Sequence, residues 1–210
     1  MFNRIVFLFF CFFLAGCSGQ VSKNIEFSAS SDQALILMGY EKTGGLEPEL
    51  SFSAYDASNG SVIGGNNYTV SIGTHLLGVP KKKGTYILAF TVDPGTFFLK
   101  QKSDTIGYDT YITIFNSNTI AFKAQAGEAI YLGNFAVNET SNYVPIGKGI
   151  ERLGVDIKAA NLKLAELKNV TTELEVVEPY FVSFTCEQNK KNFLGVKSVG
   201  CYPFRVTENN

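Results

Sequence analysis

The sequence YILAFTVDPGTFFL, residues 86–99, holds two apolar runs on either side of Asp93-Pro94-Gly95. Aromatic and β-branched side chains, which are common in strands, recur in both runs. Proline followed by glycine fits the two central positions of a type II turn, where the second residue needs a positive φ. The stretch therefore predicts two strands joined by a tight turn.

Short strand-like segments continue on both sides of this turn. Residues 111–115 (YITIF), 120–124 (IAFKA) and 130–133 (IYLG) are separated by turn sequences. Upstream, residues 34–38 (ALILM) are typical of a strand buried on both faces, and residues 50–55 (LSFSAY) alternate like a half-buried strand. Repeated short strands predict a mainly-β chain folded as an antiparallel β-sandwich or small barrel.

Two polar stretches interrupt this pattern. Asn59-Gly60 and residues 64–67 (GGNN) have turn chemistry, and residues 100–109 are polar. Residues 156–168 predict one helix, because Asp156 is a suitable N-cap and apolar residues recur at helical spacing after it. These apolar residues are Ile157, Ala160, Leu164 and Leu167. We expect the helix to lie against the sandwich or to close one end of it, with a partner-binding helix as the alternative.

Residues 94–99 (PGTFFL) and 122–133 (FKAQAGEAIYLG) resemble a pattern in uncharacterised bacterial envelope lipoproteins. In those proteins a proline-glycine turn precedes a strand, an alanine-glycine-glutamate turn and a tyrosine-leucine-glycine strand. The resemblance implies a transthyretin-like β-sandwich, and an immunoglobulin-like sandwich is the alternative. It carries over no catalytic residue.

The N-terminus has the layout of an export signal. Arg4 precedes the apolar residues 5–13, which are too few to cross a hydrocarbon core. Leu14-Ala15-Gly16-Cys17 resembles the lipobox of bacterial lipoproteins, in which the cysteine becomes the lipidated N-terminus. The resemblance implies diacylglycerol and an N-acyl chain on Cys17, with no other cofactor. Ser18 is not the aspartate of an inner-membrane retention signal, which favours the outer membrane, facing the periplasm.

The chain divides into three parts on this interpretation. Residues 1–16 are a signal peptide, residues 17–31 are the lipidated N-terminus and a polar tether, and residues 32–210 are a single domain. Ile25 and Phe27 interrupt the tether and could start a first strand. An alternative boundary lies at residues 145–149, between the β-rich part and the helix.

The cysteines and charges limit the classes of function. Cys186 and Cys201 are most simply a disulfide in an oxidising compartment, at the end of a C-terminal hairpin. His75 is the only histidine, so we expect no metal site. Loss of Arg4 with the signal changes the formal net charge from −1 to −2, which argues against nucleic-acid binding.

Candidate catalytic chemistry is sparse. No Gly-x-Ser-x-Gly motif accompanies His75, and the candidate acids are scattered through turns. These acids are Asp93, Asp104, Asp109, Glu128 and Asp156. Lys81, Lys82 and Lys83 form a basic run that could contact anionic lipid headgroups, or that could be a solvated turn protecting an edge strand.

We therefore predict a lipid-anchored envelope lipoprotein that binds or scaffolds and is not an enzyme. Its partners would be the membrane, through the lipid, and an envelope protein, as in an accessory subunit of an envelope assembly. The alternatives are a hydrolase acting on envelope polymers and a lipoprotein that binds a small ligand.

Overall fold

Two β-sheets form the body of the protein in a computed structural model, which describes residues 25–42, 49–71, 84–106, 109–115, 118–137, 150–167, 169–184, 187–188, 199–200 and 206–208. The five-stranded sheet contains β1 (Ala34–Lys42), β4 (Gly84–Val92), β8 (Ala129–Val137), β9 (Ile150–Gly154) and β10 (Leu174–Val176). The seven-stranded sheet contains β2 (Glu49–Tyr55), β3 (Val62–Ser71), β5 (Gly95–Ile106), β6 (Asp109–Ile114), β7 (Thr119–Ala124), β11 (Tyr180–Phe184) and β14 (Val206–Glu208). A small ribbon pairs β12 (Glu187–Gln188) with β13 (Val199–Gly200).

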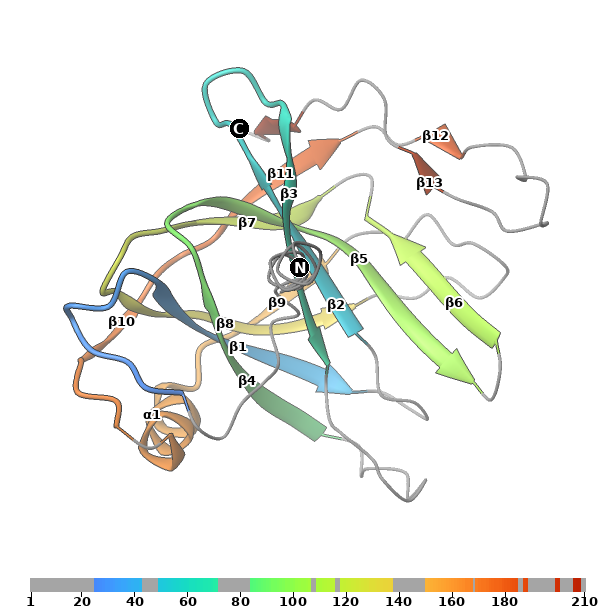
Figure 1. The fold of residues 1–210 in the computed structure, drawn as a ribbon. Helices are drawn as coiled ribbons and strands as arrows, with labels where there is room; N and C mark the ends of the chain where they lie inside the picture. The colour runs from blue at the N-terminus through green and yellow to red at the C-terminus, as the bar shows by residue number, and fades with distance from the viewer. Residues whose placement is uncertain are drawn as a thin grey trace, which may run out of the picture.

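The mainly-β fold class is confirmed, with two sheets and, in the ranges described, one helix, α1 (Ile157–Glu166) (Figure 1). The five-stranded sheet is mixed, which differs from the predicted antiparallel arrangement. β8 runs parallel to β1 on one side and parallel to β10 on the other. The reason is topological, because β8 enters from the other sheet through the turn after β7, and β10 enters after α1. Both β9 and β10 pair with β8, so the described segments before and after residues 145–149 share one sheet.

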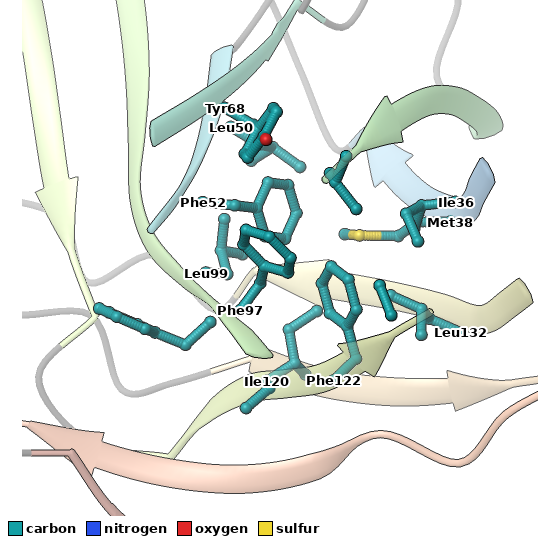
Figure 2. Close-up of a cluster of buried hydrophobic side chains, with 14 of the residues drawn as sticks. Ile36, Met38, Leu50, Phe52, Tyr68, Phe97, Leu99, Ile120, Phe122 and Leu132 are labelled. Carbon is teal, nitrogen blue, oxygen red and sulfur yellow. The ribbon is translucent and has the colours of Figure 1, made fainter. Parts of the chain in front are cut away.

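Aromatic side chains fill the space between the two sheets (Figure 2). Phe52, Phe97 and Phe122 come from the seven-stranded sheet, and Ile36 and Met38 face them from β1. All five are almost completely buried. Burial of such side chains is the main stabilising contribution to a domain of this size, at about 25 cal/mol for each Å² of apolar surface removed from water.

Helix α1 lies on the outside of the five-stranded sheet, against β1 and β4 (Figure 1). Ala160, Leu164 and Leu167 pack on the sheet as predicted, whereas Ile157, predicted on the same face, is 41% exposed. Asp156 is the N-cap, because its side chain accepts a hydrogen bond from Ala159 N. Within the ranges that are described, no helix is long and apolar enough to cross a membrane.

The folded domain begins earlier than the predicted boundary at residue 32. Ile25 and Phe27 are buried in the cluster beneath α1, and Phe27 forms a parallel bridge with Val170. Phe27 N donates to Asn169 O at 3.3 Å, and Thr171 N donates to Phe27 O at 3.1 Å. Ile25 and Phe27, the two residues that interrupt the predicted tether, therefore belong to the folded domain, because their apolar side chains cover a surface beneath α1.

Two stretches are strand where the sequence indicated none. β3 runs through residues 64–67, which were predicted to turn, and β5 and β6 extend over the polar residues 100–109 apart from 107 and 108. Pairing outweighs local preference in β5, which has β2 on one side and β6 on the other. In β3, Asn67 pairs with Ser53 of β2, whereas residues 64–66 lie at the register shift between the two strands.

Candidate functional site

The residues predicted to be lipidated, bonded or in contact with the membrane lie outside the described residues: Cys17, Cys186, Cys201, Lys81, Lys82 and Lys83, together with His75. Glu187 and Gly200, the neighbours of the two C-terminal cysteines, face each other in the β12–β13 ribbon. The disulfide, the lipid and the lysine contact stay predictions.

Three of the scattered acids have defined structural partners. Asp93 Oδ1 accepts a hydrogen bond from Gln33 Nε2 at 3.1 Å. Glu128 Oε2 accepts one from Gln125 N at 3.0 Å, and Asp156 Oδ1 accepts one from Ala159 N at 3.0 Å. The last two carboxylates therefore each satisfy a backbone N–H in their own turn or helix end. In the described part of the chain, no three His, Cys, Asp or Glu side chains are grouped so that they could hold a metal ion.

Polar side chains do gather where β8, β9 and the start of α1 meet. Tyr131 is the centre of this group, with its side chain completely buried. Its hydroxyl donates to Asn134 Oδ1 at 2.6 Å and accepts from Asp156 N at 3.3 Å. We call Tyr131, Asn134, Arg152 and Asp156 the junction cluster. It connects the middle of the five-stranded sheet to the N-terminus of α1.

Asn134 occupies its place because β1 offers no side chain there. Gly39 pairs with Asn134 across a register shift between β1 and β8. A Cβ atom at Gly39 would stand 1.7 Å from Asn134 Oδ1 and 2.6 Å from its Cγ. The absence of a side chain at Gly39 therefore leaves room for the acceptor of the Tyr131 hydrogen bond.

Arg152 enters the junction cluster from β9. Its guanidinium Nη1 pairs with Glu178 Oε1 at 2.5 Å, and Nε is buried with no hydrogen-bond acceptor among the described residues. Gly133 has φ +96°, and a Cβ atom there would stand 3.2 Å from Arg152 Nε and 2.8 Å from Gly154 O. Because Glu178 is 82% exposed, the ion pair adds little stability. The arginine stem mainly fills space where the register between β8 and β9 shifts.

The electrostatics of Tyr131 suit a structural phenol. Burial raises the pKa of Tyr131, and the nearby Asp156 carboxylate raises it further, against opposing effects of the Asp156 N–H and of Arg152. The hydroxyl therefore stays protonated at neutral pH, where it donates to Asn134. A protonated phenol with both donor and acceptor engaged is a poor base or nucleophile. The hydrogen bonds of the Tyr131 hydroxyl therefore have a structural role, which is to hold the N-terminus of α1 against the five-stranded sheet.

A second set of polar groups lies on β5, in the stretch whose polarity predicted no strand. Lys102 is 3% exposed and pairs in register with Leu50, a residue of the core. Lys100 lies where the β2–β5 register shifts, and burial lowers the pKa of its amine. Both lysines lie within the β2–β5 part of the sheet and are shielded from water. The sequence contains no pattern that distinguishes them from lysines exposed to solvent.

No protein-family model matches the chain, and no curated protein and no solved structure is significantly similar to it. Of the junction cluster, only Asp156 was predicted to have a local role. Tyr131 lies in the tyrosine-leucine-glycine strand of the resemblance, which gave no indication of the hydrogen bonds that its hydroxyl makes.

Proposed function

We propose that this protein is an exported lipoprotein, held to a membrane by lipid on Cys17, whose β-sandwich binds or scaffolds an envelope protein. The proposal takes its location from the lipobox and, if the organism has two membranes, from Ser18, which favours the outer membrane and its periplasmic side. It assigns no catalytic residue. Lipid on Cys17 is the only prosthetic group that it requires.

The short distance in sequence between Cys17 and the folded domain carries this proposal. Ile25 is only eight positions after Cys17, and it is 93% buried. Eight residues, even fully extended, span at most about 28 Å. The domain would therefore stay at the membrane surface, where a lipid-anchored binding module has to meet its partners.

The edge strand β6 supports the binding role. In the described part of the chain β6 pairs with β5 alone, and it lies at the margin of the seven-stranded sheet (Figure 1). Its sequence, DTYITI, has high strand propensity and holds neither the lysine nor the proline that usually protect an edge. An extended segment of a partner could add to this edge by backbone hydrogen bonds. The two longer edge strands, β3 of the same sheet and β4 of the five-stranded sheet, approach each other.

The anchor is tested by substituting Cys17. We expect Cys17→Ala to move most of the protein from the membrane fraction, after a high-salt wash, to the soluble fraction or to leave it as an uncleaved precursor. Cys11→Ala is the matched control, because Cys11 lies in the apolar run and is removed with the signal. A Cys17→Ala protein that is cleaved normally and still sediments with membranes would show that the anchor is not this lipid.

The binding role is tested by crosslinking in intact cells. A photoreactive benzoylphenylalanine in place of Tyr111 on β6 is expected to capture one stoichiometric protein partner. The same substitution at Tyr86 on β4 is the matched control and is expected to capture much less. Capture from position 86 alone, or from neither position, would remove the support for β6 as the contact edge.

A further inference from the structure

Most of the large apolar side chains that remain exposed in the described chain lie between residues 153 and 176. Six of them are more than 40% exposed: Ile63, Leu153, Val155, Ile157, Leu162 and Val176. Only Ile63 belongs to the seven-stranded sheet, on β3. The other five lie on β9, on the link to α1, on α1 itself and on β10. We call these five the helix-side residues.

A hydrogen bond and the strand register place three of the helix-side residues, Val155, Ile157 and Val176, near the side chain of Tyr131. Val176 is the register partner of Tyr131, and paired residues of neighbouring strands point to the same face. Asp156 N donates to the Tyr131 hydroxyl, which brings the adjacent Val155 and Ile157 close to the same side chain. The ring of Tyr131 belongs to the cluster under α1, so these residues lie on the outer, helix-covered side of the sheet.

Leu162 extends this apolar surface along α1. It follows the buried Ala160 by two positions, which is about 200° around a helix, so its side chain points away from the sheet. Leu162 is the most exposed of the large apolar residues, at 61%. An outward-facing leucine on a packed helix does not contribute apolar burial to the fold. Its side chain can be buried only by a surface outside the domain.

The charges on this segment show no excess of positive groups. Residues 153–167 contain two lysines and two carboxylates, with Lys163 Nζ 3.1 Å from Glu166 Oε2, and the exposed Glu173, Glu175 and Glu178 surround Val176. A surface with apolar side chains and no excess of positive charge is not attracted to anionic headgroups. It fits a layer in which apolar side chains can be buried without charge pairing, such as the interfacial region of a zwitterionic bilayer.

The N-terminal chain enters the domain on this same side. Phe27 bridges Val170, four residues beyond Glu166, the last residue of α1, and Ile25 is buried beneath α1. A flexible link of eight residues has a root-mean-square span of about 16 Å, and a ten-residue helix is about 15 Å long. An anchor at Cys17 would therefore hold the helix side, rather than the seven-stranded sheet, nearest the membrane.

We infer that the helix-side residues dock on the lipid bilayer that carries the protein's own anchor, so that α1 lies at the membrane surface. This inference rests on the proposed lipidation of Cys17. The lipid on Cys17 attaches the domain to the membrane. Burial of the helix-side residues in the interfacial layer fixes the orientation of the domain relative to the membrane.

Tryptophan fluorescence tests this orientation, because the chain contains no tryptophan. The lipidated protein with Leu162→Trp, and separately with Ile63→Trp as the matched control, is reconstituted into phosphatidylcholine vesicles and isolated by flotation. We expect the tryptophan at 162 to shift its emission to the blue, to be quenched by brominated phosphatidylcholine and to lose most of its quenching by iodide. The tryptophan at 63 is expected to keep its quenching by iodide.

Each outcome separates the inference from the proposed function. If both variants float and both tryptophans are equally open to iodide, the anchor is correct and the docking is wrong. If protection at 162 increases with the density of protein in the vesicles, a second copy covers the helix side and the lipid inference is also wrong. If the variants do not float, the anchor itself fails and the docking fails with it.

Discussion

We expect Phe52→Ala to lower the free energy of unfolding by about 3–5 kcal/mol, the range for removal of a buried aromatic side chain. Phe52 is completely buried and is one of the side chains that join the two sheets. Its ring stacks on that of Phe90, from the opposite sheet, with centroids 5.3 Å apart. It also meets Phe122 edge-on at 5.9 Å. Truncation of the side chain would leave a cavity between the two sheets, because the sheets cannot move closer to fill it.

Urea denaturation of the purified mature protein measures this change. Phe52→Leu should cost clearly less than Phe52→Ala, because leucine fills more of the space than alanine does. Phe181→Ala is the matched control, since Phe181 is a half-buried phenylalanine on β11. Equal losses at positions 52 and 181 would contradict the role assigned to the core between the sheets.

Gly39→Ala is the second substitution with a large expected effect, a loss of about 3 kcal/mol that combines overpacking with a broken buried hydrogen bond. The new methyl group would stand 1.7 Å from Asn134 Oδ1, so the amide has to move away. Its movement takes the acceptor from the Tyr131 hydroxyl, which donates to it at 2.6 Å. The loss is measured by the same denaturation experiment.

A double-mutant cycle isolates the cause. Asn134→Ala alone removes the acceptor and should cost about 1–3 kcal/mol. The pair Gly39→Ala with Asn134→Ala should cost much less than the sum of the single changes, because the amide that clashes with the new methyl group is gone. Additive losses would mean that Gly39 is required for another reason, such as the 3.1 Å approach of a Cβ atom there to Asn134 Cα.

The strands of the core could be predicted because their pattern of apolar residues matches the faces that are buried. Residues 34–38 are apolar at every position and are all fully buried, since β1 has the core on one face and the cluster under α1 on the other. Residues 86–99 form β4 and the start of β5, but these strands belong to different sheets. The sequence predicts the break between them but not the separation, because strand pairing depends on β1 and β2. The type II turn predicted at Pro94-Gly95 is wrong, because Gly95 already begins β5 and is not among the glycines with a positive φ.

The less apolar elements could not be predicted from local pattern. Residues 64–67 carry two glycines and two asparagines, yet they lie within β3, where Ser53 Oγ on β2 donates to Asn67 Oδ1. Tyr68 then enters the core beside Phe97, with ring centroids 5.4 Å apart. These contacts join segments that are distant in sequence, so a window of a few residues does not contain the information.

The junction cluster was missed for the same reason. The helix cap at Asp156 follows from adjacent residues and was predicted correctly. The Tyr131 and Asn134 contact depends on a bulge in β8 and on the missing side chain of Gly39 in β1. No short-range rule joins positions 39 and 134, so only the pairing of these strands reveals why a polar pair lies there.

The parallel pairing of β1 with β8 also sets the timing of folding. Leu35 lies opposite Ala129, 94 positions further along the chain. Synthesis at about 5–20 residues per second would leave that partner missing for roughly 5–19 s after Leu35 is made. Pairings between such distant residues also form slowly once both are present. During that interval a nascent chain with this topology cannot complete the pairing of β1 with β8. It therefore stays incompletely folded, and a polypeptide that passes through a translocation channel has to be unfolded.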